Sequence, residues 1–126
     1  MSKDTDDYSS HFGAYNRYNT YMPSVTCPNA ERDEIQAQFG LLTADEVMLA
    51  GEGIYSYLYT GADYWTLSPS NYNEGALNFF VDVDGNLRDA YVGEIYGVRP
   101  VISLGHFLKA YNGDGSADNP FDVGIF

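Results

Sequence analysis

The clearest pattern of hydrophobic and polar positions lies in the segment GLLTADEVMLAGEG. Thr43 is a favourable helix N-cap, and Glu46, three residues later, can complete a capping box with it. Apolar residues then recur at helical spacing and share one face: Ala44, Val47 and Met48. Because Gly51 or Gly53 can end the helix, the pattern predicts a short helix, buried on one side, that begins directly after Thr43.

A second segment, ALNFFVDVDGNLRDAYV, alternates with the period of two that is typical of a β-strand. Its apolar positions fall on one face: Leu77, Phe79, Val81 and Val83. Asp84 and Gly85 interrupt the alternation and supply a pair that tight hairpin turns favour. We therefore predict a β-hairpin whose two strands meet at Asp84 and Gly85.

Three further segments carry strand patterns. IYSYLYTGADYWTLSPS alternates from Ile54 onward and predicts a strand with two semi-apolar faces. GVRPVISL predicts a last core strand, with Val98, Pro100 and Ile102 on one side. NGDGSADNPFDVGIF is rich in turn residues and predicts a loop followed by a terminal strand.

The N-terminal third is less regular. Residues 1–12 are polar and charged, and we expect a flexible segment there, before a single domain over residues 13–126. Residues 15–27 space tyrosines among polar residues and predict an extended, strand-bearing segment broken at Pro23. Residues 28–40 fit either a short helix or a loop. Together the elements predict an α+β fold, with helical structure against a small, twisted antiparallel sheet.

The charge and the apolar runs of the chain indicate which classes of partner are unfavourable. Of the 126 residues, 18 are Asp or Glu and 6 are Lys or Arg, which gives a formal net charge of -12. A field of that sign repels phosphate backbones, so we expect no nucleic-acid partner. No apolar run reaches the roughly 20 residues that cross a bilayer, so we expect no direct membrane insertion. The acidic, polar start does not match a signal peptide.

Candidate chemistry is sparse. The single cysteine, Cys27, leaves no second thiol in this sequence for an internal disulfide. Four residues have the alternate spacing of oxygen-rich calcium loops: Asn112, Asp114, Ser116 and Asp118. Gly-Asp-Gly-Ser is also a favourable turn, so we assign no metal ligand and no cofactor. The carboxylates lie at no spacing that pairs an acid with a base; we therefore assign no catalytic residue and expect a protein that is not an enzyme.

Several segments in this order resemble C-type-lectin-like domains of bacterial and phage proteins: GLLTADEVMLAG, YWTLSPS, the short hairpin, GVRPVISL and GDGSADNPF. The first is similar to a helix of the formylglycine-generating-enzyme and sulfatase-modifying group. The block from Trp65 to Pro100 looks most like the variable region of diversity-generating-retroelement target proteins. The resemblance spans Leu41 to about Phe121. The cysteines on which formylglycine formation depends have no counterpart in the matching half, so that activity is not expected.

The resemblance implies a fold whose two termini pair as strands, with one strong and one short helix, and whose loop-bearing half displays a binding surface. By position, the candidate ligand-binding residues are Asn71, Tyr72, Asn73, Glu74, Asn78, Arg88, Asp89, Tyr91, Glu94 and Tyr96. Tyrosine offers a large contact area with a polar tip, and Asn and Asp adapt their hydrogen bonds, which suits recognition. These residues form two polar patches, one over residues 71–78 and one over residues 88–96. The alternative is that both patches are ordinary solvated turns, where Asn and Asp are also common.

These features predict a receptor-recognition module for an unknown protein or carbohydrate ligand. The resemblance implies that the residues of its binding surface are hypervariable among relatives. The resemblance places such a module in a larger bacterial surface, extracellular or virion protein. The alternative is a structural or assembly domain of the same fold, which would form a defined oligomer. The sequence leaves the oligomeric state open.

Two residues outside the patches have separate interpretations. Trp65, the single tryptophan, can either plug the core or stack on a ligand, and the core position is favoured. Arg99 lies in an apolar segment, where an unpaired charge is costly, so a carboxylate partner is expected. The predicted partner is Glu46 or Asp45 of the capped helix.

Overall fold

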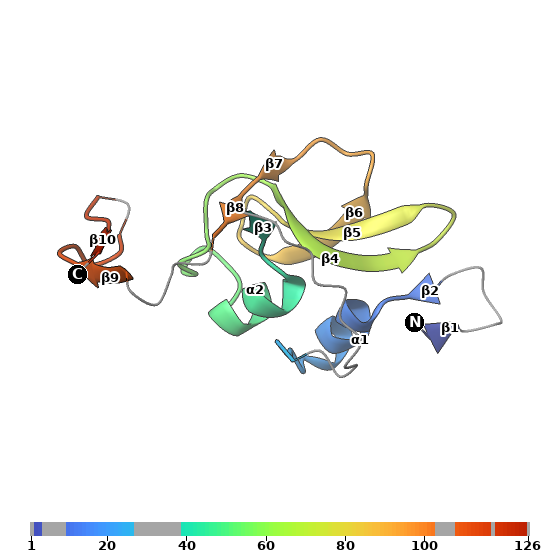
Figure 1. Cartoon of the computed structure of the whole chain (residues 1–126). Helices are drawn as coiled ribbons and strands as arrows, with labels where there is room; N and C mark the ends of the chain where they lie inside the picture. Colours follow the sequence, from blue (N-terminus) through green and yellow to red (C-terminus); the bar gives the residue numbers. More distant parts are fainter. Residues whose placement is uncertain (1, 4–9, 27–38, 103–107, 117, 126) are drawn as a thin grey trace.

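The computed structural model describes residues 2–3, 10–26, 39–102, 108–116 and 118–125 (Figure 1). Its elements, in chain order, are β1 (Ser2–Lys3), β2 (Ser10–His11), α1 (Gly13–Thr20), β3 (Gly40–Leu41), α2 (Ala44–Ala50), β4 (Tyr64–Tyr72), β5 (Ala76–Val81), β6 (Leu87–Tyr91), β7 (Gly97–Val98), β8 (Pro100–Val101), β9 (Leu108–Tyr111) and β10 (Asp122–Ile125). Cys27, nearly all of the segment 28–40 and most of residues 1–12 lie outside the described residues, so the expectations there stay predictions.

The main sheet has the strand order β1-β2-β4-β5-β6, and β7 pairs with β4 at the end away from β2. Its pairs are antiparallel except β4 with β7, which is parallel. The long strand β4 shifts register twice against β5, once on each side of Pro69. Such irregularities bend and twist a strand, so β4 curves along its length (Figure 1).

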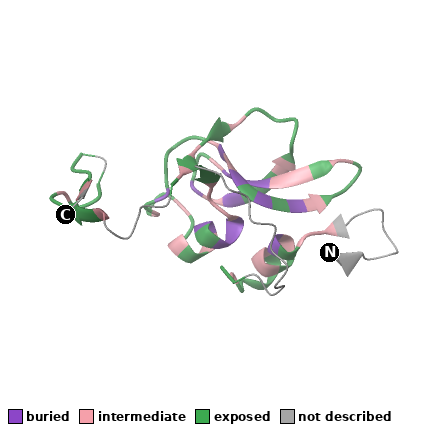
Figure 2. Cartoon of the chain, viewed as in Figure 1, coloured by how far each residue is buried: buried purple, intermediate pink, exposed green. Residues whose placement is uncertain are grey.

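Both described helices lie on one side of this sheet, which we call the inner face; the opposite side is the outer face (Figure 1). Successive residues of a strand point to opposite faces, so only alternate strand residues reach the helices. Buried residues gather between the sheet and α2 (Figure 2). The buried apolar core consists of Ala14, Ala44, Val47, Leu58, Tyr64, Phe79, Val81 and Leu87. The coarse α+β class is therefore confirmed.

The inner face of β4 also carries three buried hydroxyl groups, those of Thr66, Ser68 and Ser70. Thr66 Oγ1 donates to the Phe79 carbonyl oxygen at 2.8 Å, and Ser68 Oγ accepts from the backbone N–H of Ala44 at 2.9 Å. Ser70 Oγ donates to Asp89 Oδ2 at 2.7 Å. Each hydroxyl bonds a different element, namely β5, α2 and β6, so these buried polar groups are satisfied.

The helix predicted after Thr43 is confirmed as α2. Thr43 Oγ1 accepts from the backbone N–H of Glu46 at 3.2 Å, and Glu46 Oε2 accepts from the backbone N–H of Thr43 at 2.8 Å, which completes the capping box. Gly51 ends the helix. Ala44 and Val47 are buried, as their shared face predicts.

The predicted hairpin is confirmed as β5 and β6, and Gly85 lies in the turn with φ of 81°. Phe79 and Val81 are buried on the inner face. Val83 is not, because β5 ends at Val81 and Val83 lies in the exposed turn. The Asp82 side chain accepts two backbone N–H bonds from that turn, so the turn begins before Val83.

The extended segment predicted over residues 15–27 is wrong for residues 15–20, because Gly13–Thr20 form helix α1, whereas residues 21–26 form neither a helix nor a strand. Tyr15 and Tyr18 are three residues apart, which places them on one side of a helix. Both pack against the buried core. Tyr21 ends the helix with φ of 52°. The tyrosines therefore follow the helical period.

Two other strand predictions are wrong. The chain from Ile54 to Gly61 forms turns and bends, and the strand begins only at Tyr64. GVRPVISL forms two strands of two residues, β7 and β8, which pair with β4 and β3 respectively. Because the chain crosses from one partner to the other, its apolar residues do not line a core: Val98, Pro100 and Ile102 are all exposed.

Within the described residues, the two ends of the chain do not pair with each other, contrary to what the resemblance implies. β1 pairs with β2, whereas β10 pairs with β9. The two chain ends lie at opposite sides of the view (Figure 1). The terminal strand itself is confirmed, as the second strand of a separate hairpin.

Candidate functional site

The structure brings parts of the two predicted patches together. The first lies at the end of β4 and in the turn to β5, and the second lies on β6 and in the loop after it. Asn71 Nδ2 donates to Asp89 Oδ2 at 3.4 Å, and the Tyr91 hydroxyl donates to the Asn73 carbonyl oxygen at 3.3 Å. The Tyr91 ring also lies over Gly75, where a Cβ atom would be only 2.9 Å from the ring. These contacts join residues 18 apart in the sequence into one surface.

Two more candidates lie at the rim of this surface. Tyr72 is exposed at the end of β4, and its Cα pairs in register with Ser10 and Ala76. Glu74 is exposed at the tip of the turn, with φ of 56°. Both side chains are exposed and therefore available for contact.

The remaining candidates have other surroundings. Asn78 Nδ2 donates to the carbonyl oxygens of Thr66 and Phe79, so the amide is used inside the sheet. Glu94 is exposed in the loop before β7. Tyr96 packs on the outer face, against Phe80.

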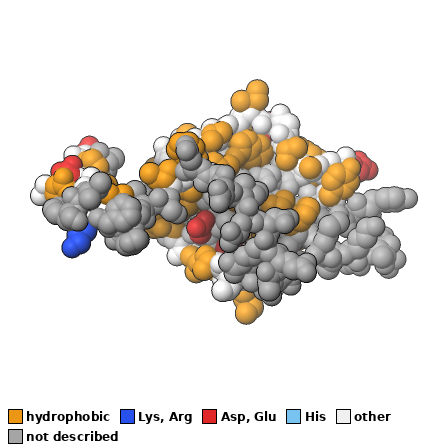
Figure 3. All heavy atoms as spheres, viewed as in Figure 1, with side chains coloured by type: hydrophobic (Ala, Val, Ile, Leu, Met, Phe, Trp, Pro, Cys, Tyr) orange, Lys and Arg blue, Asp and Glu red, His pale blue; other side chains and the backbone are white. Residues whose placement is uncertain are grey.

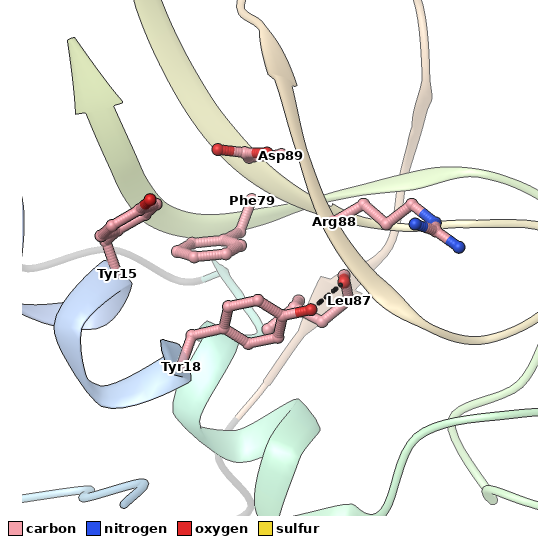
Figure 4. A pocket seen from close by; sticks show the side chains of 6 residues that line it. All are labelled: Tyr15, Tyr18, Phe79, Leu87, Arg88 and Asp89. Carbon is pink, nitrogen blue, oxygen red and sulfur yellow. Dashed lines mark hydrogen bonds between the residues drawn. The ribbon is translucent and has the colours of Figure 1, made fainter. Parts of the chain in front are cut away.

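Beside this surface lies an open cavity of about 220 Å³ between α1 and β6 (Figure 4). We call it the tyrosine cleft. It is lined by Tyr15, Tyr18, Phe79, Leu87, Arg88 and Asp89. In Figure 4 the Phe79 ring lies at the centre, with the two tyrosine rings and Asp89 around it, and the Arg88 guanidinium points away. Two of the predicted ligand-binding residues, Arg88 and Asp89, thus border a concave site.

The polar groups of the tyrosine cleft differ in how far they are already engaged. The Tyr18 hydroxyl donates to the Leu87 carbonyl oxygen at 3.1 Å. Arg88 Nε donates to Asp82 Oδ2 at 2.6 Å. Asp89 Oδ2 accepts from Ser70, whereas Asp89 Oδ1 and the Tyr15 hydroxyl have no hydrogen-bond partner in the described part of the chain. The cleft therefore offers one carboxylate oxygen and one phenol to a ligand.

The electrostatic surroundings of the cleft are acidic. Burial raises the pKa of the Tyr18 phenol, and the carboxylates of Glu52 and Asp89 raise it further, while Arg88 acts in the opposite direction. At Arg88 the hydrogen bond to Asp82 raises the pKa of the guanidinium. Because Arg88 is tied to Asp82, its charge is already balanced, and the uncompensated charge beside the cleft is negative.

Sequence reasoning missed Tyr15 and Tyr18. The signal was present in their spacing of three, but the polar residues between them suggested an extended segment instead. The ring of His11 stacks on that of Tyr15 with centroids 4.3 Å apart, so β2 also supports the cleft wall. No local pattern brings α1 beside β6, because Tyr18 and Leu87 are 69 residues apart.

A second aromatic group lies on the outer face. Trp65 and Phe80 are direct neighbours in β4 and β5, and Tyr96 stacks on Phe80 with ring centroids 4.4 Å apart. The Trp65 and Tyr96 centroids are 4.8 Å apart. Trp65 is thus half-buried within this outer cluster and does not belong to the inner core, where it was expected.

Apolar side chains continue beyond the outer cluster. Leu67 and Val98 are exposed, and Ile95, in the loop before β7, has 95% of its surface exposed. Hydrophobic side chains are visible over the upper part of the molecule, on the side of the sheet (Figure 3). The outer face is therefore a second candidate for contact with another molecule.

The predicted partner of Arg99 is wrong. Arg99 Nη1 donates to the Leu58 carbonyl oxygen at 2.5 Å, and its guanidinium lies over the Tyr64 ring, 5.5 Å from the centroid. The Asp45 carboxylate instead accepts two hydrogen bonds from Arg17. Since Arg99 is only half-buried, a carbonyl oxygen and a ring face replace the expected carboxylate.

The spacing that suggested a calcium loop forms a turn in the structure. Asp114 Oδ1 accepts from the backbone N–H of Ser116, and Ser116 Oγ accepts from that of Asn119. Hydrogen bonds from the Ser116 side chain and backbone N–H, and from the Asn119 side chain, hold the pKa of Asp114 below its usual value. Among the described residues, no group of three or more His, Cys, Asp or Glu side chains is arranged to hold a metal ion.

Comparisons with protein-family models, with curated proteins and with solved structures found no match to this chain. In the described ranges, no helix is long and apolar enough to cross a membrane.

Proposed function

We propose that the chain is a ligand-binding domain that recognises a protein or glycan with the surface formed by the β4–β5 turn, β6 and the tyrosine cleft. One observation carries this proposal. Asn71 and Asn73 contact Asp89 and Tyr91, so two polar patches from separate segments form one surface beside a concave, aromatic-lined site.

The chemistry of the surface suits recognition. Tyr72 and Tyr91 are each about half exposed and offer contact area with a polar tip, while the strands beneath them are fixed by backbone pairing. Side chains held on a rigid sheet lose little entropy when they bind, which favours affinity. The resemblance to C-type-lectin-like variable proteins supports a binding role for this surface. The pairing of the two termini that the resemblance also implied is not part of the proposal.

The experiment is a screen of arrayed peptides and glycans with the labelled full chain. Tyr72→Ala and Tyr91→Ala should each abolish or strongly reduce the signal of any ligand that binds. Tyr55→Ala is the matched control, because Tyr55 is 96% exposed, lies in the turns between α2 and β4, and does not line the tyrosine cleft. Binding that both site variants retain would contradict the proposal.

The hypervariable character of the surface is a separate part of the proposal. Sequences of close relatives from one genome should differ at the candidate ligand-binding residues and agree at buried positions such as Phe79 and Val81. The differences should fall in adenine-rich codons, beside a near-identical repeat and a reverse-transcriptase gene. Relatives whose differences are spread evenly along the chain would contradict the hypervariable character of the surface, but they would not contradict its binding role.

A second candidate, an assembly domain, is favoured by the exposed apolar residues of the outer face: Leu67, Ile95 and Val98. Light scattering after size-exclusion chromatography distinguishes the two. An assembly domain should form a defined oligomer that Val98→Asp disrupts. A monomer at all concentrations would remove this candidate.

A further inference from the structure

The strand β6 forms one edge of the main sheet. In an antiparallel pair, alternate residues bond the neighbouring strand and the residues between them point outward. The backbone N–H of Asp82 donates to the Asn86 oxygen and that of Val92 donates to the Ala76 oxygen, so residues 86, 88, 90 and 92 face β5. Leu87, Asp89 and Tyr91 therefore direct their backbone groups away from the sheet.

The outward groups of Leu87 are already used. Its N–H donates to Glu52 Oε2 at 2.9 Å, and its carbonyl oxygen accepts from Tyr18. The Tyr91 carbonyl oxygen accepts from the backbone N–H of Glu94. Three outward groups have no partner in the described ranges: the N–H and carbonyl of Asp89 and the N–H of Tyr91. A free stretch of edge thus lies directly beside the tyrosine cleft.

Such an edge can accept an added strand from a partner, whose alternate side chains then enter pockets beside it. The tyrosine cleft is the adjacent pocket. Its volume of about 220 Å³ is below the roughly 300–1,000 Å³ that is typical of small-molecule sites, and it suits a single side chain.

The chemistry of the cleft selects the kind of side chain. Aromatic ring faces and a carboxylate oxygen together favour a cation. The cleft presents the rings of Tyr15 and Tyr18, together with Asp89 Oδ1, which has no partner among the described residues. Arg88, the basic residue among those that line the cleft, is bonded to Asp82 and points away from the cavity (Figure 4). A net charge of -12 attracts a basic partner to the chain as a whole.

We propose that β6 and the tyrosine cleft bind a short, extended segment of a partner protein that carries a lysine or arginine. The segment pairs with the edge at Asp89, and its cationic side chain enters the cleft between the two tyrosine rings and contacts Asp89 Oδ1. This inference rests on the proposed ligand-binding role and specifies the ligand class of that surface.

The test uses the full chain and a labelled pentapeptide, Thr-Val-Lys-Val-Thr, capped at both ends. Fluorescence anisotropy should detect binding that is at least about tenfold weaker when norleucine replaces the lysine, as expected when a charge-assisted hydrogen bond is lost. A peptide N-methylated at the lysine should also lose affinity, because it cannot complete the strand pairing. In amide NMR spectra the N–H signals of Asp89 and Tyr91 should shift on binding.

Asp89→Asn is the matching protein variant. The asparagine keeps an oxygen for the Ser70 hydroxyl but removes the charge, so the fold is retained and the affinity for the lysine peptide should fall by at least about tenfold. Asp118→Asn is the control, because it makes the same change of charge at an exposed residue in the terminal hairpin, and it should bind like the unaltered chain.

Equal affinity for the lysine and norleucine peptides, or no binding of either, would overturn the inference. The array screen then separates it from the proposed function. If a glycan or neutral peptide binds and Tyr91→Ala abolishes that binding, the ligand-binding role stands and only the basic segment is excluded. If Tyr72→Ala and Tyr91→Ala both leave that binding unchanged, the ligand-binding role falls as well.

Discussion

Arg17 and Asp45 connect the two described helices through a two-pronged ion pair. Arg17 Nε donates to Asp45 Oδ1 at 2.6 Å, and Nη2 donates to Oδ2 at 2.7 Å. The backbone N–H of Ser24 adds a third hydrogen bond to Oδ1 at 2.9 Å. The carboxylate is buried at the first turn of α2, so its charge is balanced by residues of α1 and of the chain that follows it.

Arg17→Met should destabilise the fold by about 2 kcal/mol. This is below the roughly 3–5 kcal/mol of a fully buried pair, because the Arg17 side chain is 34% exposed. The methionine keeps most of the aliphatic stem and leaves the Asp45 carboxylate without its cation. The measurement is urea unfolding. Arg88→Met removes the exposed ion pair with Asp82 and should change the midpoint much less; an equal effect of both variants would contradict the argument.

The stability of the chain should fall in acid partly because of Asp45. Burial acts to raise the pKa of this carboxyl, but the hydrogen bonds from Arg17 and Ser24 outweigh it and hold the folded pKa below the ordinary value of 3.8. A depressed folded pKa contributes stability above the unfolded pKa, and that contribution is lost as the pH falls through the folded value.

Thermal unfolding between about pH 7 and pH 2.5 checks this linkage. The melting temperature of the unaltered chain should fall from about pH 5 downward, and Asp45→Asn should start lower and fall less steeply. Asp118→Asn should follow the curve of the unaltered chain. Parallel curves for the unaltered chain and Asp45→Asn would show that Asp45 does not contribute.

Gly85 should not tolerate a side chain. Its φ is 81°, and a Cβ atom there would lie 2.6 Å from the Gly53 carbonyl oxygen. Gly85→Ala should therefore cost at least about 2 kcal/mol, from backbone strain together with the clash. Gly93→Ala is the control, because a Cβ there meets no atom within 4 Å. Unfolding midpoints for the two variants test the prediction, and similar values would refute it.

Trp65 fluorescence should report on Tyr96. Trp65 is the single tryptophan, and its ring packs against Tyr96 on the outer face. Tyr96→Ala should expose the indole and shift its emission to longer wavelength. Tyr55→Ala, at an exposed residue outside the ring contacts of Trp65 with Phe80 and Tyr96, should leave the spectrum unchanged. If Tyr96→Ala also leaves it unchanged, the outer cluster is not packed in solution as described.

The elements that sequence reasoning placed correctly are those fixed by local chemistry. The capping box of Thr43 and Glu46 specifies where α2 begins, and the turn at Gly85 specifies the hairpin. The wrong predictions concern segments whose structure depends on contacts with residues distant in the sequence. Val98 looks like a core residue, but the two-residue strands β7 and β8 pair with different neighbours and leave it exposed.

The candidate site was predictable only in part. The polar patches at Asn71 and Asp89 were identified from residue type and from the resemblance. Their contact was not identified, because it depends on the pairing of β4, β5 and β6. The cleft itself requires Tyr18 to reach Leu87 from a distant helix. No periodicity encodes that contact.

The three hydroxyl groups on the inner face of β4 fix the register of this strand against its neighbours. Thr66, Ser68 and Ser70 each bond a different neighbour, so a slip of β4 by one residue would turn all three toward solvent and break the three bonds together. Apolar contacts alone would allow such a slip to be partly repacked. Because these hydrogen bonds are directional, they form together only when β4 is in the correct register. The same register places Asp89 at the mouth of the cleft.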